Sequence, residues 1–280
     1  MIKNHPIGVF DSGVGGLTVV SEIIKQLPNE NIVYFGDTAR VPYGEKTPQQ
    51  INAFVREIIN FLLKFKVKAV IMACNTSSAL AYPTVKNEYD IPMFEMINPA
   101  IEEVKNASKN KRVGVIANYV TINSNVFKDK IENIGDGYKA FQQACPLLVP
   151  LVERGETDTS YAEKVLHTYL DPMISEDIDT LILGCTHYPH LLPPIIRITG
   201  IDVNVLDPAE KVVNKAKDYF TRNDLLKDDS RRMHKYFVSG SPSHFERTAR
   251  VLFAGEDYSN VEQVQPEKLQ AAGRKINVFL

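Results

Sequence analysis

The sequence predicts a protein of the doubly wound α/β class. Short continuous apolar runs alternate along the chain with longer segments whose apolar residues recur at helical spacing. Strands that are apolar throughout are typical of a parallel sheet covered by helices on both faces. In such sheets, ligands bind beyond the carboxyl ends of the strands. A weak internal repeat also indicates two related halves.

Each predicted element follows from a local pattern. The turn at 11–16 is rich in glycine, and the helix predicted at 17–27 is closed by Pro28. A second helix is predicted at 48–65, where apolar side chains recur every three to four residues. Strands are predicted at 7–10, 31–35, 69–73, 93–97, 113–116, 180–183, 203–206 and 235–238.

The internal repeat relates two pairs of segments. Residues 6–11 resemble 112–117, and residues 68–76 resemble 179–187, at offsets of 106 and 111 residues. Parallel strands look alike by chance, so the first match alone carries little weight. In the second match, each strand leads into a cysteine followed by two polar residues. The repeat therefore predicts a cysteine in the same position of each half.

Two Asx-Pro dipeptides suggest where the halves join. Proline disfavours helical geometry in the residue before it, so Asn98-Pro99 and Asp207-Pro208 suit crossovers between domains. We expect one discontinuous α/β domain from 1–98 plus 208–280 and a second from 99–207.

Composition excludes several classes of protein. The chain has 280 residues, 44% hydrophobic and 24% charged, with a net charge of −2. This balance gives no basic footprint for nucleic acid and no polybasic patch for a membrane surface. No segment resembles a signal peptide or a membrane span, so we expect a cytoplasmic protein.

The cysteines are too few and too far apart for a structural framework. Cys74, Cys145 and Cys185 make an odd number, which argues against disulfides in a cytoplasmic chain. None belongs to a CxxC pair, so we expect no metal site. Cys145 precedes a proline and lacks polar neighbours, and we interpret it as structural.

Cys74 and Cys185 are the strongest candidates for chemistry. Cys74 leaves a strand and precedes a helical stretch, and a helix N-terminus favours a thiolate. Cys185 likewise follows a strand and precedes a predicted helix, and His187 could transfer a proton to or from it. A lone buried cysteine is usually structural. Two matched thiols, however, suit the removal of a proton from one face of a carbon and its replacement on the other.

Other motifs are less specific. The glycine-rich turn at 11–16 could approach a ligand, but Thr18 stands where a dinucleotide fingerprint needs its third glycine. Asp37 could imitate the ribose-binding acid of that fingerprint. The turn at 38–44 is placed to contact a ligand, and a plain turn explains it equally well. Glu153 is a further candidate, although a solvated surface glutamate is the default interpretation.

At these residues the chain resembles the glutamate racemases of the aspartate/glutamate racemase superfamily. The resemblance runs from the first strand to about Phe253. Its motifs lie at 10–18, 36–44, 73–76, 149–153 and 184–189.

The resemblance implies a reaction, a fold and a role. It implies an isomerase, an amino-acid racemase that interconverts L- and D-glutamate without pyridoxal phosphate, metal or other cofactor. D-glutamate supplies peptidoglycan biosynthesis, and thereby cell wall biogenesis and cell shape. The implied fold is two α/β domains related by a pseudo-two-fold axis, with the active site in the cleft between them. The implied assembly is a homodimer.

The resemblance also implies residue roles. Cys74 and Cys185 would be the catalytic acid/base pair, assisted by Asp11, His187 and Glu153. The implied substrate-binding residues are Asp11, Ser12, Tyr43, Gly44, Asn75, Thr76, Asn118, Thr121, Thr186 and His187. One stretch departs from the family pattern: Ala117-Asn118 stands where the family usually has Gly-Thr, which bears on substrate affinity and choice.

Three alternatives remain open from the sequence. A sister enzyme, an aspartate or hydantoin racemase, would share the cysteine pair. A cysteine-dependent amidase or hydrolase would use one thiol as the nucleophile and leave the other idle. A non-catalytic small-molecule binding protein would retain the cleft without turnover.

Overall fold

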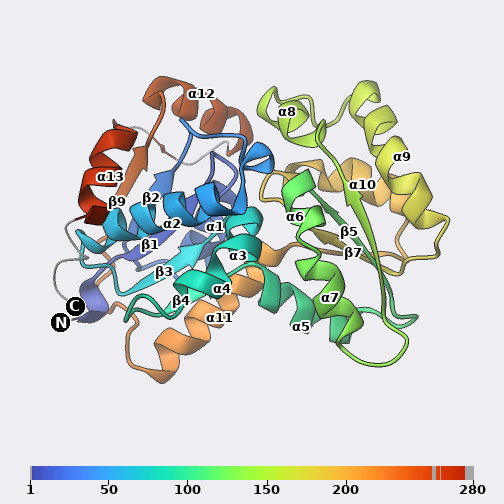
Figure 1. Cartoon of the computed structure of the whole chain (residues 1–280), viewed down its shortest axis with the longest axis horizontal. Helices are drawn as coiled ribbons and strands as arrows, with labels where there is room; N and C mark the ends of the chain where they lie inside the picture. The colour runs from blue at the N-terminus through green and yellow to red at the C-terminus, as the bar shows by residue number, and fades with distance from the viewer. Residues whose placement is uncertain (1, 254–256, 259, 275–280) are drawn as a thin grey trace.

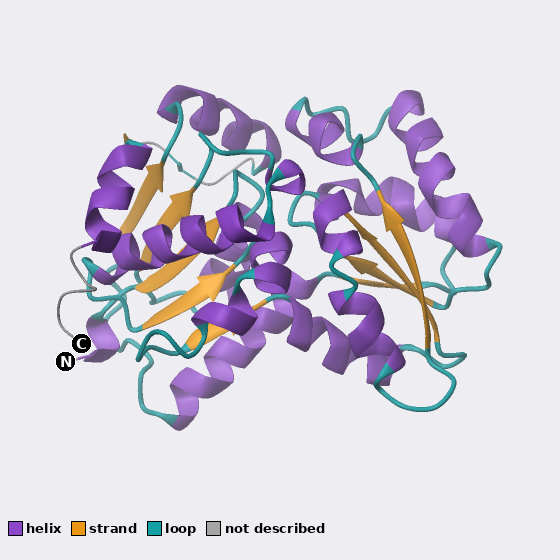
Figure 2. Ribbon diagram, in the orientation of Figure 1, coloured by secondary structure: helices purple, strands orange, loops and turns teal. Residues whose placement is uncertain are grey.

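The computed structural model describes residues 2–253, 257, 258 and 260–274, which form two lobes side by side (Figure 1, Figure 2). Within these residues the strands form two fully parallel sheets, one of six strands and one of four. The larger sheet has the order β10 (Val261–Gln263), β9 (His234–Val238), β2 (Ile32–Gly36), β1 (Ile7–Asp11), β3 (Ala69–Met72), β4 (Met93–Glu95). The smaller has the order β6 (Lys139–Ala144), β5 (Arg112–Ala117), β7 (Thr180–Leu183), β8 (Asn204–Leu206).

The two sheets share one strand order. The run β2-β1-β3-β4 of the larger sheet matches β6-β5-β7-β8 of the smaller one. Ile7 pairs with Ala69 in the larger sheet, and Val113 pairs with Thr180 in the smaller one. These are the pairs that the offsets in the sequence relate. The internal repeat is therefore present in strand order and in register.

Helices cover both faces of each sheet (Figure 2). On the larger sheet, α1 (Leu17–Gln26), α11 (Pro208–Arg222) and α12 (Pro242–Leu252) pack on one face, and α2 (Pro48–Leu63) and α13 (Pro266–Arg274) on the other. On the smaller sheet, α8 (Leu148–Glu153), α9 (Ser160–Ile174) and α10 (Leu192–Thr199) lie opposite α5 (Ile97–Ala107) and α7 (Val126–Glu132). The remaining short helices are η1 (Ile2–Asn4), η2 (Tyr43–Glu45), η3 (Tyr188–Leu191), α3 (Asn75–Leu80), α4 (Tyr82–Val85) and α6 (Tyr119–Asn123).

Burial on both faces explains the apolar strands. In β1, Ile7 and Val9 pack toward α1 and α11, whereas Phe10 packs toward α2. All three side chains are fully buried. A strand in this position has no solvent-facing side, so its sequence is apolar at successive residues.

The structure differs from the sequence prediction at two edge strands and one strand end. β6 and β10 were not predicted, because their short sequences, KAFQQA and VEQ, mix polar with apolar residues and form no continuous apolar run. The strand predicted at 93–97 is wrong at its end: the chain turns into α5 at Ile97. The Glu95 carboxylate accepts hydrogen bonds from the backbone N–H groups of Ile97 (2.6 Å) and Asn98 (2.8 Å) and so provides acceptors for two N–H groups in the first turn of that helix.

The predicted domain boundaries stay a prediction. The larger sheet draws its strands from residues 7–95 and 234–263, and the smaller sheet from 112–206. The boundary at 98/99 falls in the first turn of α5, and Asp207 is the N-cap residue of α11. Among the helices described, none is long and apolar enough to cross a bilayer.

Candidate active site

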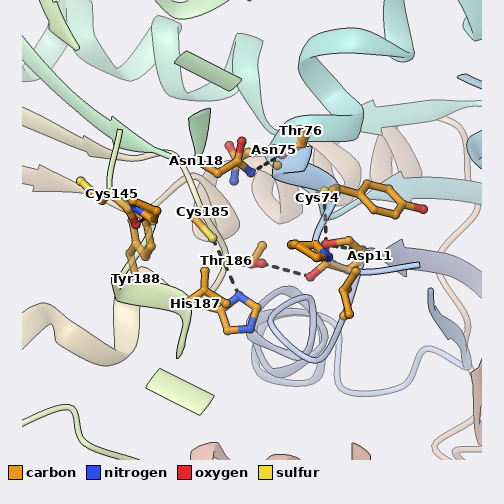
Figure 3. A pocket seen from close by; sticks show the side chains of 18 of the residues that line it. Asp11, Cys74, Asn75, Thr76, Asn118, Cys145, Cys185, Thr186, His187 and Tyr188 are labelled. Carbon is orange, nitrogen blue, oxygen red and sulfur yellow. Dashed lines mark hydrogen bonds between the residues drawn. The ribbon is translucent and has the colours of Figure 1, made fainter. Parts of the chain in front are cut away.

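One cavity of about 380 Å³ lies where the carboxyl ends of the two sheets meet (Figure 3). Asp11 ends β1 and Cys74 follows β3 in the larger sheet; Asn118 follows β5 and Cys185 follows β7 in the smaller one. The site residues predicted from the sequence that line the cavity are Asp11, Ser12, Tyr43, Gly44, Cys74, Asn75, Thr76, Asn118, Glu153, Cys185, Thr186 and His187. Thr121 is fully buried behind this wall.

Cys74 precedes a helix, as the sequence predicts, and is the N-cap residue of α3, which begins at Asn75. It is 5% exposed, and its thiol donates to the hydroxyl of Ser12, with 3.8 Å between Sγ and Oγ. The start of α3 favours the thiolate, as expected, but two larger effects outweigh it. Burial raises the pKa of Cys74 to about 12, and the charge of Asp11 adds to the rise. The N–H of Ser77 at the start of α3 only partly opposes them.

Cys185 has a different setting. The chain does not enter an α-helix directly after β7, because the turn at 184–187 leads into η3. The Sγ atom of Cys185 lies 3.8 Å from Nδ1 of His187, and the other ring nitrogen, Nε2, lies 3.1 Å from Oε1 of Glu153. The three side chains therefore form a chain from the cavity toward solvent, since Glu153 is 38% exposed.

The charged form of His187 is stabilised by its two neighbours. Burial opposes protonation of the ring, but the hydrogen bonds with Cys185 and Glu153 outweigh it and raise the pKa of His187 to about 10. Burial also opposes the charge of Glu153, yet the hydrogen bond from His187 leaves the pKa of Glu153 lowered. The positive charge of the imidazolium form therefore lies beside the sulfur atom of Cys185.

Asp11 connects the two sheets. Its Oδ1 atom accepts the backbone N–H of Ser12 at 2.7 Å, and its Oδ2 atom accepts the hydroxyl of Thr186 at 3.0 Å. Thr186 lies between Cys185 and His187, so the carboxylate beside Cys74 holds the turn that carries the second thiol. Sequence reasoning expected Asp11 to assist Cys74, and its direct contact with Thr186 was not foreseen.

A second buried carboxylate supports the loop around Tyr43. The Tyr43 hydroxyl donates to Oδ2 of Asp37 at 2.6 Å, and Ser239 at the end of β9 donates to Oδ1 at 2.7 Å. Asp37 is fully buried, and Arg40 lies 3.5 Å away. Burial raises the pKa of Asp37, against the effect of Arg40 and these hydroxyls. Asp37 thus does not line the cavity but fixes the loop that forms one of its walls. Ser239 was missed because it is about 200 residues away in the chain.

The amide of Asn75 is buried at the cavity wall without a partner. The residue is 3% exposed, and neither Nδ2 nor Oδ1 makes a hydrogen bond with any part of the chain that the structure describes. An unpaired buried amide is costly unless a ligand or water satisfies it. Asn75 is therefore a ready hydrogen-bonding group for a ligand in the cavity.

Thr76 and Asn118 join the two halves beside Asn75 (Figure 3). Asn118 donates from Nδ2 to Oγ1 of Thr76 at 2.6 Å and, as N-cap of α6, accepts the N–H of Thr121 at 2.9 Å. The Thr121 hydroxyl lies 2.9 Å from Oγ1 of Thr76. The departure at Ala117-Asn118 thus leaves a side chain that reaches across to the other half. Ala117 is fully buried and accommodated as the last residue of β5.

Several wall residues were not among the predicted site residues. Cys145 was interpreted as structural; it is 1% exposed and burial raises the pKa of its thiol, yet it also lines the cavity. Val41, Pro42, Glu45 and Tyr119 flank the predicted residues. Further wall residues are Gly13, Pro146, Val149, Pro150, Gly184 and Tyr188.

The arrangement suits proton transfer on both faces of a small polar molecule. It holds two thiols in different settings, one beside a charged imidazole and one beside hydroxyl and carboxylate groups. Among the described residues, no group of three or more His, Cys, Asp or Glu is placed to hold a metal ion.

Comparisons with known proteins agree with this geometry. Residues 7–216 match the model of the Asp/Glu/hydantoin racemase family. A glutamate racemase of Thermoanaerobacter pseudethanolicus is 42% identical over 95% of this chain and 100% of its own length. A glutamate racemase isoform of Bacillus anthracis superposes with a TM-score of 0.89 at 38% identity, covering 94% of this chain and 98% of that one. A glutamate racemase of Francisella tularensis, solved with D-glutamate, superposes with a TM-score of 0.86 at 36% identity, covering 94% and 97%.

Proposed function

Because the chain belongs to the Asp/Glu/hydantoin racemase family, we propose that it interconverts L- and D-glutamate by proton transfer between Cα and two thiols. The observation that carries the proposal is the placement of Cys74 and Cys185 on one cavity by equivalent strands of two sheets. The relatives named above are glutamate racemases, one of them solved with D-glutamate, which supports glutamate as the substrate.

We propose that the two thiols begin the reaction in different roles. Cys74, with its raised pKa, starts as the protonated acid, and Cys185, whose sulfur lies 3.8 Å from the ring of His187, acts as the base. Cys185 removes the Cα proton from one enantiomer, and Cys74 gives its own proton to the opposite face. After this step Cys185 is a thiol and Cys74 a thiolate, so the reverse reaction uses the same two groups in exchanged roles.

The Cα–H bond of an amino acid is a very weak acid, so the cavity must stabilise the developing carbanion. Preorganised donors in a water-poor site achieve this at no reorganisation cost. The Asn75 amide and the hydroxyls of Ser12, Thr76 and Thr186 are the groups that line the wall between the thiols. We assign substrate binding to these groups, to the loop at Tyr43-Gly44, and to Asn118 with Thr121 behind Thr76.

The wider setting follows from the family. We propose that the D-glutamate formed supplies peptidoglycan biosynthesis in the cytoplasm, that the enzyme works as a homodimer and that it needs no cofactor. The resemblance supports each of these points.

The test follows the Cα–H signal of L-glutamate in D₂O by NMR together with optical rotation, with no cofactor added. Loss of both signals with the wild-type enzyme, and retention of both with Cys74→Ala and with Cys185→Ala, is the expected result. Cys145→Ala is the matched control, since it removes a third thiol from the same cavity and should keep most of the activity. Aspartate in place of glutamate tests the sister reaction.

Other outcomes would support the remaining alternatives. Full activity in either single variant would exclude the two-thiol mechanism. An acyl-enzyme trapped on one thiol would indicate an amidase or hydrolase. Binding of glutamate without Cα exchange would indicate a binding protein.

A further inference from the structure

Thr18 makes a bond between the two halves that the proposed chemistry does not yet explain. It is the second residue of α1, and its hydroxyl donates to the backbone carbonyl of Thr186 at 2.9 Å, across 168 residues of sequence. A threonine near the start of a helix often caps the helix's own N–H groups. Here the N-cap position belongs to Gly16, which makes no side-chain bond, and the Thr18 hydroxyl points to the other half.

The carbonyl that Thr18 holds lies between Cys185 and His187. The same turn is fixed at a second point by the bond from the Thr186 hydroxyl to Asp11, which Figure 3 marks. A third contact is steric: a Cβ atom at Gly15 would lie 2.5 Å from Oγ1 of Thr186 and from Nδ1 of His187. The turn that carries the second thiol therefore rests on the segment from Asp11 to Thr18.

The side chain of Cys185 is held less firmly than the backbone of its turn. The hydrogen-bond partner of its Sγ atom within the described residues is Nδ1 of His187, at 3.8 Å. Its position relative to Cys74 therefore depends on the backbone of the turn. Cys74 belongs to the same half as Thr18, so fixing the Thr186 peptide to that half fixes the separation of the two thiols.

We propose that Thr18 is a positioning residue that sets the second thiol by holding the Thr186 carbonyl. Thr18 does not line the cavity. Its loss should therefore affect the chemical step more than substrate binding. The inference rests on the proposed function, because a two-thiol reaction needs both sulfur atoms in line with Cα on opposite faces. A displacement of about 1 Å at a reacting group costs on the order of a hundredfold in rate.

The experiment compares Thr18→Val, which keeps the shape and removes the hydroxyl, with Thr18→Ser, which restores it. Thr199→Val is the matched control: Thr199 is also half-buried and donates to a backbone carbonyl at 3.0 Å, but within α10. We expect Thr18→Val to lower kcat at least about tenfold with little change in KM. Thr18→Ser should recover most of kcat, and Thr199→Val should match the wild type.

A second readout does not depend on turnover. The alkylation rates of Cys185 and Cys74 are measured by mass spectrometry in one sample. Their ratio reports how the surroundings of Cys185 change, with Cys74 as the internal reference. We expect Thr18→Val to change this ratio and Thr18→Ser to restore it. Wild-type kcat in Thr18→Val, equal losses in both variants, or an unchanged ratio would overturn the inference. If the wild type does not racemise glutamate, the proposed function fails, and the ratio alone decides the role of Thr18.

Discussion

The hydroxyl of Tyr43 donates to a carboxylate oxygen of Asp37 at 2.6 Å. Tyr43 lines the cavity, and its hydroxyl is already hydrogen-bonded within the protein. Tyr43 therefore offers a ligand its ring and the backbone of its loop. The same loop reaches the other half, since a Cβ atom at Gly44 would lie 3.3 Å from Cβ of Asn118.

Tyr43→Phe tests this arrangement. The change leaves a buried carboxylate with one donor fewer, which should cost about 1–3 kcal/mol of unfolding free energy. Because the loop then loses its anchor, KM for glutamate should rise several-fold while kcat changes less. Denaturant titration and initial-rate kinetics measure the two effects. Tyr89→Phe, which removes a part-buried hydroxyl that donates to the Arg56 carbonyl, is the control and should leave KM unchanged. An unchanged KM in Tyr43→Phe would contradict the role of the anchor.

Glu153→Gln should move the pH dependence of the reaction. His187 has a pKa raised to about 10, and Glu153 is one of the two groups that raise it. The stabilisation from this raised pKa is complete below the ordinary value of 6.5 and is lost as the pH rises through about 10. Without the Glu153 charge the pKa of His187 falls, so the basic limb of the kcat/KM profile should shift to lower pH.

The control for that profile is Glu156→Gln, since Glu156 pairs with the exposed Arg154 nearby in sequence. It should leave the profile in place. A basic limb that stays fixed in Glu153→Gln would show that the imidazolium of His187 does not govern it.

Asp11→Asn should make the Cys74 thiol more reactive toward alkylation and should nevertheless slow racemisation. Burial, and then the charge of Asp11, raise the pKa of Cys74 to about 12. Removing the charge lowers that pKa, so Cys74 should be alkylated faster at a given pH between 8 and 10. Racemisation should nevertheless slow, because Asp11 also holds Thr186. Alkylation rates by mass spectrometry test the sign, and a slower alkylation of Cys74 would contradict it.

The sequence predicted the interior of the fold better than its edges. β1, β3, β5 and β7 are buried on both faces, so their apolar runs and the repeat between them were visible in the chain. β6 pairs on one side only, has no fully buried residue and carries Lys139, Gln142 and Gln143, which leaves a pattern that a loop could share.

In the site, the lining residues were predictable from the sequence, whereas the hydrogen bonds that hold the walls in place were not. The predicted residues that line the cavity follow strand ends, and the topology of parallel sheets brings such positions together. The bonds that hold the walls in place were not predictable, because they join segments that are far apart in sequence. Ser239 to Asp37 and Thr18 to Thr186 are examples, and neither pair has a local pattern that marks it.

Asn75→Ala should reduce activity without reducing stability. The Asn75 amide is buried and makes no hydrogen bond within the described residues, so its removal breaks none. Relief of an unpaired polar group should leave the unfolding free energy equal or higher, by up to about 1–3 kcal/mol. The loss of a donor beside the developing charge should lower kcat/KM by on the order of a hundredfold. Lower stability together with unchanged kcat/KM would show that the amide serves the fold and not the ligand.

Gly15→Ala should disable the second thiol through packing alone. The new Cβ would lie 2.5 Å from Nδ1 of His187 and from Oγ1 of Thr186, so the turn that carries Cys185 must move. Because Gly15 contributes no polar side chain, a fall in kcat can only reflect displacement of its neighbours. Gly135→Ala is the matched control, since a Cβ there meets nothing within 4 Å. Kinetics and thermal unfolding on both variants are the measurement. If Gly15→Ala keeps the wild-type kcat, the turn tolerates movement, and close packing against the glycine-rich segment does not set the position of Cys185.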